Sequence, residues 1–327
     1  MADVMTSTKE ADIQSAFCTL INQLSAEVVG QPEVIRGLVL ALLCDGHVLV
    51  EGPPGTGKTR AVKTMARYLA ADFGRVQFTP DLLPADLTGS EVYTAARELV
   101  FQHGPLFNHL ILADEINRAP ARVQSALLEA MEEKQVTVGT QTYALPQPFL
   151  VMATQNSLDQ EGTYPLPEAQ LDRFLMKLTV DYPTREADLS ILKLQQAEEQ
   201  ALPSTCALVA LTQVETARQQ ISKVIVSDAI AQYIVDLVQA TRHPEKYSDQ
   251  LAAWLKHGVS ARAILALHRV ARASAWLKGR DHVIPEDVKE QLVPCLAHRI
   301  SLSYEALANS VSTGDLIEAL SEHVVAH

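Results

Sequence analysis

Apolar residues in the first half of the chain gather in short runs, and segments with helical spacing separate these runs. The runs predict buried strands at residues 48–51, 76–79, 110–114, 150–154 and 175–180. The spacing predicts helices over residues 17–26, 32–44 and 61–71. Strands that alternate with helices favour an α/β fold, in which a five-stranded parallel sheet has helices on both faces.

The pattern changes near Pro183, after which strand signals nearly vanish. Pro183 disfavours helix at the residue before it, and Thr184 can cap the helix that follows. Helical spacing then continues at residues 185–198, 208–219, 228–241, 261–277, 285–298 and 303–307. We therefore expect three parts, which are a flexible N-terminus (1–16), an α/β domain (17–184) and a smaller all-α domain (185–327).

Composition limits the classes of function. The chain has 327 residues, of which 47% are apolar, and this suffices for two globular domains. Its net charge of −12 opposes general nucleic-acid binding, which depends on basic residues. The cysteines lie far apart, which suggests neither a zinc site nor a disulfide framework and favours a cytoplasmic location: Cys18, Cys44, Cys206 and Cys295. Residues 1–12 are polar and the longest apolar run covers only 38–44, so we expect no secretory leader and no membrane span.

A phosphate-binding loop is the strongest single motif. The pattern G-x-x-x-x-G-K-[ST] is matched at every fixed position by Gly52-Pro53-Pro54-Gly55-Thr56-Gly57-Lys58-Thr59. Glycines let backbone N–H groups surround phosphate oxygens, the Lys58 ammonium would reach the outer phosphates, and the Thr59 hydroxyl would ligate Mg²⁺. The alternative is an ordinary glycine-rich turn before a helix. We assign nucleotide binding to Pro54, Gly55, Thr56, Gly57, Lys58, Thr59 and Arg60.

Carboxylates at the end of a predicted strand complete a hydrolytic site. The apolar run at 110–114 ends in Asp114 and Glu115, whose side chains leave the strand in different directions. Asp114 can hold Mg²⁺ while Glu115 faces an attacking water. Asn156 follows another predicted strand, where it could orient the water or contact the γ-phosphate. The alternatives are an acidic turn for the carboxylates and a turn asparagine for Asn156.

Together with other segments, these motifs resemble the AAA+ ATPases and, within them, the MoxR family. The resemblance covers about residue 17 to the end. Its most specific runs are Ala113-Asp114-Glu115-Ile116-Asn117-Arg118-Ala119 and Glu161-Gly162-Thr163-Tyr164-Pro165-Leu166-Pro167-Glu168-Ala169-Gln170-Leu171-Asp172-Arg173-Phe174. Shorter matches are Val29-Gly30-Gln31, Gly104-Pro105-Leu106-Phe107, Ala153-Thr154-Gln155-Asn156 and Gly258-Val259-Ser260-Ala261-Arg262-Ala263.

The resemblance implies a role for each matched residue. Asp114 and Glu115 are similar to the Walker B pair, and Asn156 is similar to sensor 1. Arg173 resembles the arginine finger that a neighbouring subunit inserts into the site, whereas Arg262 resembles sensor 2 on the helical lid. Two further assignments follow the same resemblance: Gly30 and Gln31 form the adenine-binding edge, and Arg118 is either a second interface arginine or a structural partner. One departure from the family is Ala261, where the family often has proline before the sensor arginine.

The resemblance also implies two hairpin inserts in the sheet domain. One lies between residues 87 and 107, around residues 94–97. The other, at 135–145, is predicted by the residues alone, because β-branched runs flank a small polar turn. Similar ATPases direct such hairpins toward a central pore or a partner surface, and the alternative is surface decoration.

The function implied by the resemblance is Mg²⁺-dependent ATP hydrolysis by a ring-shaped, hexameric ATPase. Such proteins act as chaperone-like remodellers or maturation factors beside a partner with a von Willebrand factor A domain. Two alternatives stay open from the sequence, a nucleic-acid-stimulated motor and a nucleotide-dependent switch or scaffold. The acidic composition opposes the first alternative, and the intact Asp114-Glu115 pair opposes the second.

Overall fold

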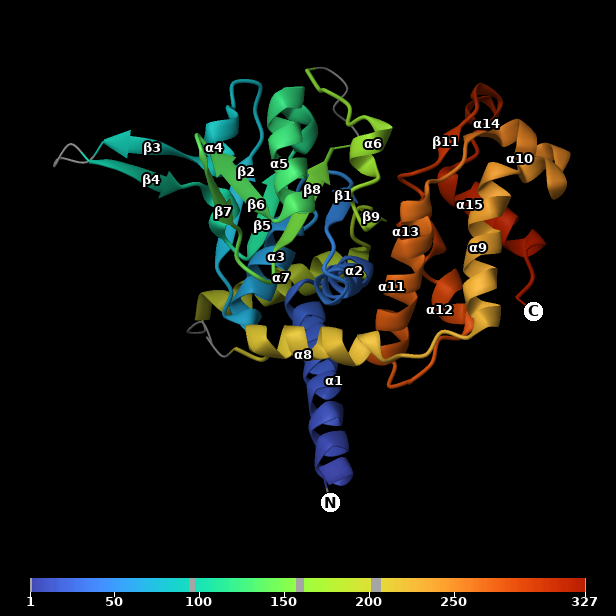
Figure 1. Ribbon diagram of the computed structural model, residues 1–327, viewed down its shortest axis with the longest axis horizontal. Coiled ribbons are helices and arrows are strands. Elements are labelled where there is room, and N and C mark those ends of the chain that lie inside the picture. The colour runs from blue at the N-terminus through green and yellow to red at the C-terminus, as the bar shows by residue number, and fades with distance from the viewer. Residues whose placement is uncertain (1, 94–97, 157–161, 201–206, 327) are drawn as a thin grey trace. The chain divides into compact units, whose positions relative to one another are not determined.

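A computed structural model describes residues 2–93, 98–156, 162–200 and 207–326 (Figure 1). The chain forms two compact units. The α/β unit comprises Ser15–Arg173 and Leu178–Glu215. The helical unit comprises Thr216–His327 together with Phe174–Lys177 and Met1–Gln14. Within the described residues, no helix combines the length and the apolar character needed to cross a membrane.

The chain forms a five-stranded parallel sheet, which confirms the predicted fold class. Its strand order is β2 (Phe73–Gln77), β5 (Leu110–Asp114), β8 (Leu150–Gln155), β1 (Val48–Glu51) and β9 (Met176–Thr179). The register aligns Leu110 with Leu150 and Leu49 with Ala153. Strands β5 and β8 are buried along almost their whole length, as expected for central strands of a parallel sheet.

Helices and hairpins surround the sheet. Helix α2 packs on β1 and β8, while α3 packs on β5. The helices that lie wholly in the α/β unit are α2 (Pro32–Leu43), α3 (Lys58–Leu69), α4 (Pro84–Thr88), α5 (Ala121–Glu133), α6 (Glu168–Leu171) and α7 (Arg185–Gln200). Helices α1 (Ala2–Glu27) and α8 (Leu211–Ser222) each have residues in both units. Short 3₁₀ turns occupy Pro105–Phe107 and Ile116–Arg118. Two antiparallel hairpins accompany the sheet, β3 (Gly89–Tyr93) with β4 (Leu99–His103) and β6 (Gln135–Val138) with β7 (Gln141–Ala144). The β3–β4 hairpin projects away from the sheet (Figure 1). The predicted tip of the first, residues 94–97, lies outside the described residues.

Two helices differ from the sequence predictions in this part of the chain. Helix α1 begins at Ala2, well before the predicted start at residue 17, because no proline or glycine interrupts the segment before Phe17. Helix α7 groups with the sheet rather than with the helical unit. Its residue Glu198 pairs with Arg60 of α3, and its Ala187 lies beside Gly30.

The helical unit contains the helices α9 (Asp228–Arg242), α10 (Asp249–Trp254), α11 (Ala261–Leu277), α12 (Pro285–Lys289), α13 (Leu292–Leu296), α14 (Tyr304–Ala308) and α15 (Thr313–His323), with a 3₁₀ turn at Pro244–Lys246. The predicted helix at 285–298 is divided into α12 and α13. Pro294 explains the division, because in a continuous helix its ring would clash with the carbonyl of Glu290. A short antiparallel pair, β10 (Leu255–His257) with β11 (Ser301–Leu302), was not predicted.

Candidate active site

The phosphate loop connects β1 to α3, as the motif predicts. Gly57 is the residue before α3 and has a left-handed backbone with φ of 82°, which only glycine adopts at little cost. At Gly52 a Cβ atom would lie 2.2 Å from the Val180 carbonyl oxygen, so a side chain there would push the loop away from the chain beyond β9. Both glycines therefore keep the loop tight against the sheet and place the first turn of α3 behind it. The backbone N–H groups at this helix start suit an anion.

Lys58 folds over the loop from the first position of α3. Its ammonium donates hydrogen bonds to the Gly52 carbonyl at 2.7 Å and to the Pro53 carbonyl at 3.1 Å. Burial lowers the pKa of Lys58, although the negative charges of Asp114 and Glu115 act in the opposite direction. The side chain is thus held at the loop beside two carboxylates, where phosphate oxygens would add the negative charge that favours its protonated form.

Asp114 and Glu115 emerge together at the carboxyl end of β5. Asp114 accepts a hydrogen bond from the Thr154 hydroxyl on Oδ1 at 2.7 Å and one from the Arg75 guanidinium on Oδ2 at 2.8 Å. Glu115 has a left-handed backbone with φ of 58°, unusual for a residue with a side chain. Its N–H donates to Thr154 Oγ1 at 2.9 Å. Thr154 therefore anchors both acids, and the strained backbone turns Glu115 away from Asp114.

The Glu115 carboxylate has two partners of its own. Gln77 Nε2 donates a hydrogen bond to Glu115 Oε2 at 2.8 Å, and Arg118 Nε lies 3.1 Å from the same oxygen. In this structure Arg118 is therefore an ion-pair partner of Glu115, three residues further along the chain. The glutamate side chain keeps 25% of its surface exposed, so water can still reach it.

A cavity of about 440 Å³ brings most of the predicted site residues together. Its lining residues are Pro54, Gly55, Thr56, Gly57, Lys58, Thr59, Arg60, Arg75, Gln77, Asp114, Glu115, Thr154, Gln155 and Asn156. Sequence reasoning missed Arg75, Gln77 and Thr154 as functional residues. Two of them, Arg75 and Gln77, could have been found from the alternation of side chains along β2. Both point to the exposed face of this strand, which pairs with β5.

The donor set at this cavity fits a magnesium ion. Thr59 and Asp114 offer the hard oxygen ligands that Mg²⁺ prefers, and Mg²⁺ is typically held by one or two carboxylates together with substrate phosphates. Among the described residues, no cluster of three or more histidine, cysteine or acidic side chains could form a complete metal cage. A single carboxylate beside a phosphate loop therefore suits an ion that arrives with a nucleotide.

The predicted adenine edge and Arg60 lie at the margin of the cavity. Gly30 and Gln31 occupy the turn before α2 and are not among the lining residues. The turn is nevertheless close to the loop, because Val28 reaches to 4.0 Å from where a Gly57 Cβ would be. Arg60 lines the cavity, but its Nε donates to the Glu27 carbonyl at 2.7 Å and its guanidinium pairs with Glu198.

The two remaining predicted arginines lie elsewhere. Arg173 is not among the residues that line the cavity, and its guanidinium contacts the end of α5 instead. There it donates to the Leu128 carbonyl at 2.8 Å and pairs with Glu132 at 3.0 Å. Arg262 belongs to the helical unit, as the second residue of α11, and its N–H donates to the Ser260 hydroxyl at 3.1 Å. The serine therefore caps this helix.

A parallel sheet with a phosphate loop after its first strand and an acidic pair at the end of another defines the class of P-loop nucleotide-binding proteins. Comparisons with known proteins agree. The profile of the ATPase family associated with various cellular activities (AAA) matches residues 47–176, and that of the AAA lid domain matches residues 252–320.

Relatives narrow the class to one family. The chain is 44% identical to Chaperone MoxR1 of Mycobacterium tuberculosis, over 87% of this chain and 75% of that protein. It is 36% identical to Protein MoxR of Paracoccus denitrificans, over 86% of this chain and 87% of that protein. A crystal structure described as that of a candidate ATPase from Cytophaga hutchinsonii superposes with a TM-score of 0.93 at 43% identity, covering 100% of this chain and 99% of that one. The chain belongs to the MoxR family of AAA+ ATPases, which confirms the resemblance.

Proposed function

We propose that this protein hydrolyses ATP with Mg²⁺ and uses the energy for chaperone-like remodelling. One observation carries the proposal: a single cavity collects Lys58, Asp114, Glu115 and Asn156 around the phosphate loop. A phosphate-binding lysine, a metal-binding carboxylate and a second acid near water are the groups that phosphoryl transfer to water needs.

Each residue has a distinct task in this mechanism. The loop and Lys58 bind the β- and γ-phosphates, and Thr59 with Asp114 would hold Mg²⁺, which supplies charge neutralisation at the phosphates when it is bound. Glu115 polarises the attacking water and accepts its proton. Asn156 orients that water or contacts the γ-phosphate. The Thr154 hydroxyl donates to the Asp114 carboxylate and accepts from the Glu115 backbone N–H, so it fixes the backbone of the general base relative to the metal ligand.

The site is completed by a second copy of the chain. Arg173 contacts α5 rather than the cavity, which supports a role in the site of a neighbouring subunit within a hexameric ring. Arg262 then reports on the γ-phosphate from the helical lid. A cation supplied in trans raises turnover by about 10³–10⁵-fold in related chemistry, so assembly would activate hydrolysis.

The chaperone-like task, the partner and the cellular compartment are proposed from features outside the site. The Mycobacterium tuberculosis relative carries the name chaperone, which supports a chaperone-like task here. We propose that the partner has a von Willebrand factor A domain, and that the protein works in the cytoplasm. Cys18, Cys44 and Cys295 form no disulfide within the described residues, which suits that reducing compartment.

Mixed assemblies test the shared site. Arg173→Ala should abolish turnover but bind ATP normally, because the arginine acts on the neighbour's nucleotide. Lys58→Ala should not bind ATP but should still offer Arg173. Mixing the two inactive variants should therefore restore part of the turnover, measured as phosphate release. A mixture that stays as inactive as its components would overturn the trans assignment.

A further inference from the structure

The main chain just after Arg173 is anchored by two side chains of the helical unit. The Phe174 carbonyl oxygen lies 3.0 Å from His298 Nε2 and accepts a hydrogen bond from Arg299 Nη2 at 2.7 Å. Arg299 Nη1 also donates to the Leu175 carbonyl at 3.3 Å. We call Phe174, Leu175, His298 and Arg299 the Phe174 clamp. All four belong to the helical unit, whereas Arg173 is the last residue of the α/β unit before them.

His298 is committed to this one contact. A carbonyl oxygen can only accept, so Nε2 carries the proton and Nδ1 carries a lone pair. That Nδ1 is buried and has no hydrogen-bond partner among the described residues. Burial, followed by the charge of Arg299, holds the pKa of His298 well below 6.5, so the ring is neutral. An orphaned buried acceptor costs about 1–3 kcal/mol, and the compensating interaction of this ring is its bond to the Phe174 carbonyl.

The Arg173 side chain and the backbone that follows it are thus held by different parts of the molecule. Its side chain is held on α5 by the Leu128 carbonyl and by Glu132, which belong to the α/β unit. One residue further along, the Phe174–Leu175 peptide is held by His298 and Arg299, which belong to the helical unit. The Phe174 side chain is completely buried, so this peptide has little freedom to rotate. Because Phe174 directly follows Arg173, a shift of the held Phe174 carbonyl changes the backbone that carries the Arg173 side chain.

We propose that the Phe174 clamp positions Arg173 for the neighbouring subunit, so that the helical unit of one subunit controls hydrolysis in the next. The proposal rests on the proposed function, in which Arg173 acts in trans. His298 and Arg299 are positioning residues, since they act through the backbone next to Arg173 and do not line the cavity. Arg262 would link the lid to its own nucleotide, and the clamp links the same helical unit to the neighbour's nucleotide.

Donor-side complementation tests the clamp. The acceptor subunit is Arg173→Ala, which binds ATP but lacks the finger. The donor subunit is Lys58→Ala, which offers the finger but binds no ATP, and it is compared with donors that also carry His298→Leu, His298→Gln or Arg299→Met. We expect His298→Leu and Arg299→Met in the donor to reduce the restored turnover by about tenfold or more, because small displacements of a catalytic group are costly. His298→Gln, which can donate from a similar position, should recover most of it.

Controls separate positioning from folding. Gln220→Met in the donor removes another buried hydrogen bond of the helical unit, the one that Gln220 Oε1 accepts from Trp276 Nε1 at 3.1 Å, and should leave the rescue unchanged. A cooperative thermal unfolding transition would show that each donor is folded. If His298→Leu does not fold, Arg299→Met still tests the clamp. Equal rescue by clamp-deficient and intact donors would overturn the clamp while keeping the trans role. No rescue even by the intact Lys58→Ala donor would instead overturn the proposed function, and the clamp with it.

Discussion

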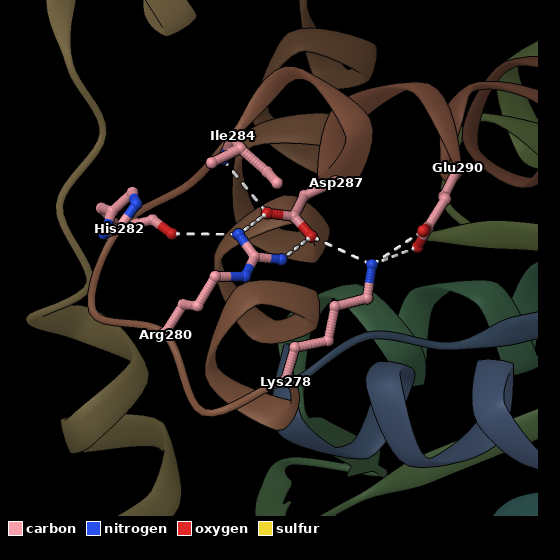
Figure 2. Close-up of polar contacts among 6 residues, drawn as sticks. All are labelled: Lys278, Arg280, His282, Ile284, Asp287 and Glu290. Atoms are coloured by element: carbon pink, nitrogen blue, oxygen red, sulfur yellow. Dashed lines mark hydrogen bonds and ion pairs between the residues drawn. The ribbon is translucent and has the colours of Figure 1, made fainter.

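Two acidic clusters in this molecule use the same chemistry for different ends. In the α/β unit, Asp114 binds Arg75 and Thr154 at the edge of a cavity and keeps 16% of its side chain exposed. In the helical unit, Asp287 has no exposed surface. Arg280 donates to both of its oxygens at 2.5 Å, and Lys278 and the Ile284 N–H add bonds at 3.2 and 3.1 Å (Figure 2).

The difference lies in how completely the carboxylate is surrounded. Burial alone would raise the pKa of Asp287, but the hydrogen bonds from Arg280, Ile284 and Lys278 outweigh it and hold the pKa below its ordinary value. That cluster is closed, with Glu290 completing it by accepting from Lys278 at 2.6 Å (Figure 2). Asp114 keeps access to the cavity, where an incoming ion can bind. A closed cluster therefore stabilises its unit, and an open one serves chemistry.

The largest effect is expected from Glu115→Gln at the open cluster. Loss of the base should lower ATP turnover by about 10²–10⁴-fold while ATP still binds. The free energy of unfolding should change little, because an amide can keep the Gln77 contact. Phosphate release, nucleotide affinity and urea unfolding measure the three quantities. If the variant turned over ATP as fast as the parent protein, Glu115 would not be the general base.

Asp287→Asn should have the next largest effect, and on stability. It leaves Arg280 and Lys278 without their shared buried anion, which should cost on the order of 3 kcal/mol of unfolding free energy. Urea unfolding followed by circular dichroism measures the loss. Asp281→Asn is the matched control. The Asp281 side chain is 90% exposed, so this substitution should lower the unfolding free energy far less. Equal losses in both variants would show that the cluster is not a stabilising element.

The smallest effect is expected from Arg75→Met. The Arg75 side chain is 50% exposed, so its ion pair with Asp114 should contribute less than about 1 kcal/mol to stability. Arg280→Met, which removes the corresponding cation from the closed cluster, should cost clearly more in the same urea titration. If the two substitutions destabilise equally, the contrast between open and closed clusters is wrong.

The sequence was enough for the parts of the site that depend on neighbours along the chain. The phosphate loop is a local motif, and its glycines lie where the backbone needs them. Asp114 and Glu115 were predictable because they directly follow an apolar run. In a parallel sheet, the carboxyl ends of strands meet at one edge, so Asn156 was expected near them and does line the same cavity.

Partners from other elements were not predictable in this way. The strand predicted at 76–79 is observed at Phe73–Gln77, and only its pairing with β5 places Arg75 and Gln77 beside the acids. Nothing local marks Asp287 as buried, since it lies in the first turn of a short helix where acids are common.

The sequence by itself determined the order of the five sheet strands, the phosphate loop and the acidic pair, because these follow from residues within a few positions of one another. Only the tertiary structure decided which carboxylate stays open and which is closed, and that His298 binds a carbonyl 124 residues away. The physical reason is that burial and long-range hydrogen bonds depend on how whole elements pack. Local spacing determines what an element is, and packing determines what its side chains meet.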